Sequence, residues 1–220
     1  MSLRETIGYA FVRTLIRAAM LLLTRTRVCG GENLPATGPG IVVCNHIAAL
    51  DPPILVGALA RPIALMSKVE NRRGLLRLFM PMVGAFTVRR GKPDRAAIAV
   101  AERVLRQGRL LCLFPEGTRS RDGALGQAHG GAALLALKTG APIIPVALSG
   151  TQRVFTRRFP WLGFPAVTVT IGRPFSLQSI GLVPGEHRGR HDDRRQLTDA
   201  IMRRIAALLP PDQRGLWGRA

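Results

Sequence analysis

Short apolar runs alternate with amphipathic stretches along most of this 220-residue chain. The apolar runs are rich in β-branched residues and bounded by Gly and Pro, which is typical of buried strands. We predict strands at 41–44, 62–67, 85–88, 110–114, 143–148 and 166–171, and helices near 52–60, 72–80, 94–106, 130–139 and 193–209. This alternation predicts an α/β sheet with helices on its faces, and the length fits one domain.

The predicted strand at 41–44 leads directly into Asn45 and His46, and Asp51 follows five residues after the histidine. Asp51 stands before two prolines, and this order is typical of a helix start with aspartate at the N-cap. We therefore expect residues 46–50 to form a loop at the carboxyl end of the strand, where open α/β sheets place ligands.

The spacing of His46 and Asp51 decides whether they can pair. Residues five apart on one helix lie roughly 140° apart around its axis, so pairing requires the chain to bend between them. A carboxylate on one ring nitrogen would fix the tautomer and support the imidazolium when the other nitrogen accepts a proton. These residues alone leave two interpretations open: a catalytic pair, or a loop histidine beside an ordinary N-cap aspartate.

Three further motifs accompany other predicted strands. The strand at 110–114 ends in Phe114-Pro115-Glu116-Gly117-Thr118-Arg119-Ser120, the strand at 85–88 is followed by arginines, and the strand at 143–148 contains proline. In this order the motifs resemble the glycerolipid (lysophosphatidate-type) acyltransferase family, with its NHxxxxD, GxxFxxR and FPEGTRS patterns and its proline-bearing strand. The matching residues are Asn45, His46 and Asp51; Gly84, Phe86 and Arg89, with one residue instead of two between the glycine and the phenylalanine; 114–120; and Pro142 and Pro145. The resemblance extends from about Val28 to Gly172.

The resemblance implies an acyltransferase with a single-domain mixed sheet and a direct mechanism without an acyl-enzyme. His46 would be the general base that accepts the proton of the acceptor hydroxyl, and Asp51 would orient it. Arg119 would hold the acceptor phosphate, and Glu116 an arginine or a glycerol hydroxyl. The full set of implied substrate-binding residues is Asn45, Lys68, Gly84, Phe86, Arg89, Glu116, Gly117, Thr118 and Arg119.

The implied reaction moves a fatty acyl group from acyl-CoA or acyl-carrier protein to lysophosphatidic acid, giving phosphatidic acid, with no metal and no bound cofactor. Two departures leave the acceptor open. Ile47 and Ala48 stand where a polar residue and a serine are common, and 127–131 lacks a lysine often found there. Glycerol 3-phosphate, a lyso-aminolipid or a glycolipid are alternative acceptors, and a non-catalytic membrane-binding protein is an alternative from another class.

The chain carries a net charge of +19 and a sequence pI near 11.8. The positive electrostatic field of such a protein attracts anionic lipid surfaces, acidic proteins or nucleic acid. Nucleic acid is disfavoured because one tyrosine and two tryptophans offer little stacking surface and no nucleic-acid-binding motif is present. An acidic acyl-carrier protein would suit the positive surface.

The first 27 residues have a polar stripe, Thr6, Arg13, Arg17 and Thr24, on an otherwise apolar helix. Their longest uncharged stretch near the end, 18–24, is well short of the ~20 residues that span a bilayer. We therefore expect a docking helix at 1–27 before an acyltransferase domain at 28–220, with the enzyme peripheral or monotopic on the cytoplasmic face of the cell membrane. The alternative is a helix packed on its own domain.

Other chemistry finds little support. His187 and His191 have a spacing compatible with a metal, but their Gly/Arg-rich surroundings supply no further ligands. Neither a P-loop nor a GxSxG elbow is present. Three cysteines do not suggest a disulfide framework, and we expect reduced thiols.

Overall fold

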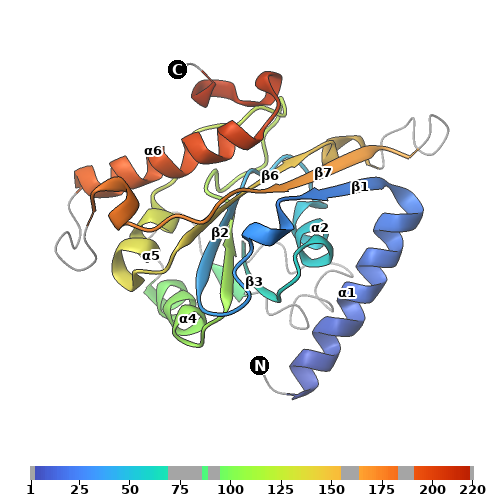
Figure 1. Ribbon diagram of the computed structural model, residues 1–220, viewed down its shortest axis with the longest axis horizontal. Helices are drawn as coiled ribbons and strands as arrows, with labels where there is room; N and C mark the ends of the chain where they lie inside the picture. Colours follow the sequence, from blue (N-terminus) through green and yellow to red (C-terminus); the bar gives the residue numbers. More distant parts are fainter. Residues whose placement is uncertain (1–2, 69–85, 89–94, 155–163, 183–190, 219–220) are drawn as a thin grey trace.

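A seven-stranded mixed sheet forms the centre of the computed structural model, which describes residues 3–68, 86–88, 95–154, 164–182 and 191–218. The strand order is β1-β7-β6-β2-β5-β3-β4 (Figure 1). Neighbours are parallel except β6 and β7, which are antiparallel. The strands are β1 Arg25–Cys29, β2 Gly40–Cys44, β3 Ile63–Lys68, β4 Phe86–Val88, β5 Leu110–Leu113, β6 Ile143–Ser149 and β7 Ala166–Ile171.

The central strands are apolar throughout because both faces of the sheet are covered. Alternate residues of β2 enter different cores: Ile41 and Val43 face one side, and Val42 and Cys44 the other. Helices α4 (Arg95–Arg106), α5 (Gly131–Thr139) and α6 (His191–Leu208) contribute to the first core, whereas α1 (Leu3–Leu23) and α2 (Asp51–Ala58) contribute to the second. Figure 1 shows these two groups of helices on opposite sides of the sheet.

Most predicted elements are present, and their ends differ by one or two residues. Strand β1 is an exception that the sequence pattern does not predict. It carries two exposed arginines, Arg25 and Arg27, and pairs only with β7 among the described residues, so it lacks the apolar run of a buried strand. Charged side chains are common on such edge strands. The domain boundary expected between residues 27 and 28 therefore falls inside β1. The helix predicted at 72–80 lies outside the described residues.

Helix α1 packs on its own domain through one face. Tyr9 and Val12 are buried in the core shared with α2, and Tyr9 Oη accepts a hydrogen bond from the Ile63 backbone N–H at 3.2 Å. Gly57 of α2 permits close approach, because a Cβ there would lie 2.6 Å from the Met20 sulfur. Thr24, which the sequence pattern placed in the polar stripe of this helix, lies just beyond its end. Its hydroxyl donates a hydrogen bond to the Met20 carbonyl at 2.6 Å.

The opposite face of α1 is exposed and apolar. Its large hydrophobic side chains are 48 to 83% exposed, and they are Leu3, Ile7, Phe11, Leu15, Leu21 and Leu22. Residues 5–23 are long and apolar enough to cross a bilayer by length and composition. One face of the same helix is nevertheless packed against α2. One face of α1 is therefore packed on its own domain, whereas the opposite face is not covered by described residues. Membrane docking through that opposite face stays a prediction.

Strand directions place several loops at one edge of the sheet. The parallel strands β2, β5, β3 and β6 all end there, and the antiparallel β7 begins there. Because β1 is parallel to β7, the carboxyl end of α1 reaches the same edge before β1 begins. Arg25 bonds the Phe164 carbonyl at 3.1 Å, and the Phe164 side chain is itself 46% exposed. We call this the catalytic edge below, because it carries His46 and Asp51, the pair that the family resemblance implies to be catalytic.

Candidate active site

His46 and Asp51 meet at the end of β2. The loop between them bends back, so that His46 Nδ1 lies 2.7 Å from Asp51 Oδ2. Asp51 is fully buried, whereas the histidine side chain is 18% exposed. With Nδ1 held by the carboxylate, Nε2 has no hydrogen-bond partner among the described residues. This arrangement leaves Nε2 available to accept a proton from a ligand.

Asp51 does not act as the helix cap that its position before two prolines predicts. Leu50 occupies the N-cap of α2 without a side-chain cap bond, and Asp51 is the first residue of the helix. Its carboxylate instead turns toward the loop, where Oδ2 accepts from the Ile47 and Ala48 backbone N–H groups at 2.7 Å. Oδ1 accepts from the Thr151 hydroxyl at 2.6 Å. The four donors offset the cost of burying a charge, which a single N-cap bond would not do.

The loop after β5 packs beside His46. Phe114 stacks on the imidazole with ring centroids 4.3 Å apart and planes inclined by 26°. The Ser120 N–H donates to the His46 carbonyl at 2.7 Å. Since Val43 and Leu113 pair in the parallel sheet, the FPEGTRS segment and the histidine loop leave the catalytic edge side by side.

Glu116 connects the loop after β2 with the loop after β5, and among the described residues its hydrogen-bond partners are backbone N–H groups. Its carboxylate accepts from the His46 N–H at 2.9 Å and from the Gly126 N–H at 3.0 Å, and the residue is 4% exposed. Burial raises the pKa of Glu116, while these two backbone donors oppose that rise. Gly126 is in turn held by the Trp217 indole N–H, which donates to its carbonyl at 2.9 Å. The C-terminal segment thereby stabilises the loop that holds Glu116. A contact between Glu116 and substrate stays a prediction.

Asn45 also has a structural position. Its amide donates to the Leu148 carbonyl at 2.9 Å, and its oxygen accepts from the Leu148 N–H at 2.7 Å. With 1% of its surface exposed, Asn45 fastens the end of β2 to β6. A direct contact between Asn45 and substrate is a prediction that these contacts do not require.

The remaining predicted residues fall into three groups. Gly117, Thr118 and Arg119 lie on the rim: Gly117 has the left-handed φ of +63°, and the other two are exposed. Lys68 ends β3 at the catalytic edge and Phe86 begins β4, with only their backbones described. Gly84 and Arg89 lie outside the described residues. The structure thus brings His46, Asp51 and Glu116 into one hydrogen-bonded cluster, with Asn45 next to it at the end of β2 and Arg119 three residues after Glu116.

Two residues that contact the His46–Asp51 pair, Thr151 and Phe114, were not among the site residues expected from the sequence. Phe114 belongs to the recognised FPEGTRS block, whereas Thr151 follows Gly150 at the end of the proline-bearing strand β6. The one sequence signal for Thr151 is that it directly follows a predicted strand, whose carboxyl end lies at the same edge of the sheet as His46. The contact with Asp51 cannot be predicted from local sequence, because the two residues are 100 positions apart.

The cysteines offer no nucleophile at this site. Cys44 and Cys112 are fully buried in β2 and β5, and burial raises the pKa of both thiols, that of Cys112 to about 12. Both are therefore neutral thiols near pH 7. In the described part of the chain, no group of three or more His, Cys, Asp and Glu side chains could hold a metal ion.

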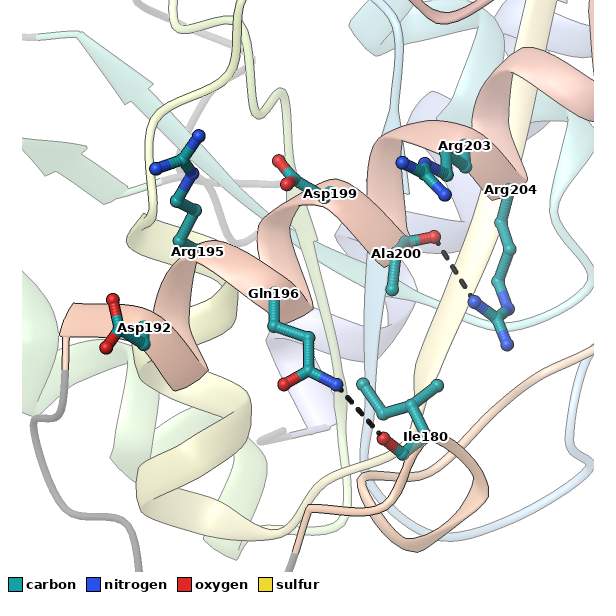
Figure 2. A pocket seen from close by; sticks show the side chains of 8 residues that line it. All are labelled: Ile180, Asp192, Arg195, Gln196, Asp199, Ala200, Arg203 and Arg204. Carbon is teal, nitrogen blue, oxygen red and sulfur yellow. Dashed lines mark hydrogen bonds between the residues drawn. The ribbon is translucent and has the colours of Figure 1, made fainter. Parts of the chain in front are cut away.

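A separate groove of about 550 Å³ lies along α6, on elements that do not contribute to this site. Figure 2 shows its lining, in which carboxylates and guanidinium groups alternate along the helix. Gln196 donates to the Ile180 carbonyl, and Arg204 lies over the Phe175 ring at 4.0 Å. None of its lining residues belongs to the loops that carry His46, Asp51 or Glu116.

A family model for acyltransferases matches residues 25–149, which contain β1 to β6 and the whole His46–Asp51–Glu116 cluster. The chain is 33% identical over 155 residues, 69% of its length, to the 1-acyl-sn-glycerol-3-phosphate acyltransferase of Borreliella burgdorferi. It covers 62% of that protein and 46 to 49% of several others, including the chloroplastic LPAT1 of Arabidopsis thaliana. The chain therefore spans about half to three fifths of the length of these relatives.

A relative with a different printed activity is also similar. The lyso-ornithine lipid O-acyltransferase of Pseudomonas aeruginosa is 31% identical over 186 residues, 80% of this chain and 71% of that protein. Among solved structures, the 1-acyl-sn-glycerophosphate acyltransferase PlsC of Thermotoga maritima superimposes with a TM-score of 0.71 and 24% identity. The match covers 94% of this chain and 82% of that one. At this identity the match supports the fold.

Proposed function

The chain belongs to the acyltransferase family, and we propose that it transfers a fatty acyl group from an acyl thioester to the hydroxyl of lysophosphatidic acid, giving phosphatidic acid. The observation that carries the proposal is the His46–Asp51 pair, with Nδ1 held at 2.7 Å and Nε2 without a described partner. The relatives named 1-acyl-sn-glycerol-3-phosphate acyltransferases support this acceptor.

In the proposed reaction, His46 Nε2 accepts the proton of the acceptor hydroxyl as its oxygen attacks the thioester carbonyl carbon. Asp51 holds Nδ1–H and stabilises the imidazolium that forms. The tetrahedral intermediate then expels the thiolate, which takes the proton back from His46 and leaves as a thiol. The step balances with the two substrates alone, so no nucleophilic side chain is needed. This agrees with the neutral thiols of Cys44 and Cys112.

We propose acyl-CoA or acyl-carrier protein as the donor and Arg119 as the contact for the acceptor phosphate. Both donors are anionic, which suits a chain with a net charge of +19. Arg119 is exposed and directly precedes Ser120, whose N–H donates to the His46 carbonyl, and this proximity in the chain supports a contact between its guanidinium and a ligand at the histidine. A guanidinium fork matches phosphate oxygens in pairs.

A second acceptor follows from the lyso-ornithine relative. That match includes 80% of this chain and 71% of the relative. A lyso-ornithine lipid presents a hydroxyl but no phosphate, so the same base would act while Arg119 lost its proposed partner. The acceptor dependence of Arg119 therefore separates the two candidates.

We propose that the protein docks as a peripheral or monotopic enzyme on the cytoplasmic face of the cell membrane. The exposed stripe of α1 would enter the interface, since the opposite face of the helix is occupied by α2. Leu21, Leu22 and Phe164 extend the apolar surface to the catalytic edge, where Arg25 could meet anionic headgroups. A docked protein would hold His46 near the plane from which a lysolipid presents its hydroxyl.

His46→Ala should lower kcat for lysophosphatidate acylation by roughly a hundredfold or more, because general-base catalysis typically supplies ~10²–10⁴. Initial rates with purified protein, and a thermal melt that verifies folding, measure the effect. His129→Ala is the matched control, since that histidine is exposed and has no contact with Asp51. Near-full activity in the folded His46→Ala protein would remove the base from the mechanism.

Arg119→Ala should raise the KM for lysophosphatidate by about tenfold or more, because a hydrogen bond to a charged group contributes ~1.5–3 kcal/mol. The KM of the acyl donor should change little. Arg203→Ala, which removes an exposed arginine of the α6 groove, controls for the loss of overall charge (Figure 2). An unchanged acceptor KM in Arg119→Ala would move phosphate binding to another residue.

Phe11→Glu should weaken binding to anionic vesicles by about tenfold or more, because burying a phenylalanine contributes ~1.5–3 kcal/mol and the new charge opposes insertion. Flotation with vesicles containing phosphatidylglycerol measures binding. Ala207→Glu makes the same charge change on exposed α6 and should float as the wild type does. Equal flotation of all three proteins would exclude the outer face of α1 from docking.

A further inference from the structure

Thr151 reaches the catalytic pair through a tight turn at the end of β6. The strand ends at Ser149, and Gly150 takes the left-handed φ of +85°. A side chain at Gly150 would be strained there and would also meet the Ala166 carbonyl oxygen of β7. The turn directs the chain into the short helix η3 (Thr151–Arg153), whose first residue is completely buried.

The hydroxyl of Thr151 is committed to Asp51. Oγ1 lies 2.6 Å from Asp51 Oδ1, and since an ionised carboxylate can only accept, the hydroxyl is the donor. The other carboxylate oxygen carries three donors: His46 Nδ1 and the N–H groups of Ile47 and Ala48. Thr151 is thus the single described donor to Oδ1, and it lies in the segment after β6, whereas the other three donors lie in the loop after β2.

We infer that Thr151 is a positioning residue for the His46–Asp51 pair, an inference that rests on the proposed function. Three donors meet Oδ2, and without the Thr151 hydroxyl no described group would hold Oδ1 against rotation of the carboxylate about the Cβ–Cγ bond. The Thr151 hydroxyl, at the start of η3, fixes that rotation, so that Oδ2 stays aligned with Nδ1 and Nε2 keeps its direction toward the acceptor hydroxyl. Thr151 itself touches neither substrate nor the reacting atoms.

A purely structural role would give a different result. If the hydroxyl only fastened η3 to α2, its removal would lower stability without a selective loss of turnover. Positioning instead predicts a fall in kcat with little change in KM, because the substrates contact other residues. It also predicts that the loss depends on the presence of His46, since Thr151 acts through it.

The test compares Thr151→Val, which keeps the shape and removes the hydroxyl, with Thr151→Ser, which keeps the hydroxyl. The valine variant should lose roughly ten- to a hundredfold in kcat with both KM values within about twofold, and serine should restore most of the loss. Thr139→Val is the matched control, because its hydroxyl donates to the Leu135 carbonyl at the far end of α5. That control should keep wild-type kcat. If Thr151→Val does not fold, Thr151→Ala takes its place in the same comparison with serine.

A double-mutant cycle completes the experiment. In a His46→Ala background, Thr151→Val should cause no further loss of the residual rate, because there is no histidine left to position. An equal loss in both backgrounds, a kcat within twofold of wild type in the valine variant, or a serine variant as impaired as valine would each overturn the inference. High activity of His46→Ala alone would instead refute the proposed base, so the two failures are distinguishable.

Discussion

The buried carboxylate of Asp51 is the constraint on which the catalytic edge depends. A charge taken out of water must be matched by donors, and Asp51 obtains three of them from the histidine loop and a fourth from Thr151 in η3, which follows β6. The Ile47 and Ala48 N–H groups fix the bend that lets residues five apart meet. The bend depends little on which side chains stand at those two positions, since only their backbone N–H groups contact Asp51. This explains how Ile47 and Ala48 can occupy a loop where polar residues are common in the resembling family.

Neighbouring elements hold the same loop from other sides. Glu116 anchors the His46 N–H, Ser120 anchors its carbonyl, and Phe114 covers one face of the ring. These contacts come from a single segment after β5, so the sheet register between β2 and β5 determines where the imidazole stands. Glu116 is a buried carboxyl whose pKa is raised by burial, and its two backbone donors link it to Gly126 and the C-terminal segment. The FPEGTRS segment therefore holds His46 in place and also carries the exposed Arg119.

Local patterns predicted the central strands and the position of His46 at a strand end because buried parallel strands have continuous apolar runs. The same logic failed for β1, whose exposed arginines resemble a loop and whose position depends on β7, about 140 residues later. It also assigned Asp51 to the helix cap, since the competing donors include Thr151, which no local pattern brings near. Asn45 and Glu116 were expected at the site, but their contacts with Leu148 and Gly126 depend on strand pairing and loop packing. The family motifs identified which residues gather there, and tertiary geometry determined what each one touches.

The claim that this edge acylates lysophosphatidate is tested most directly by identifying the product. Purified protein would be incubated with equimolar lysophosphatidate and lyso-ornithine lipid, with acyl-CoA or acyl-carrier protein as donor in separate reactions, and the lipids analysed by mass spectrometry. The account predicts phosphatidate carrying the donor's acyl chain, formed in preference to the acylated ornithine lipid. Absence of phosphatidate with both donors, or acylation of the ornithine lipid alone, would contradict it.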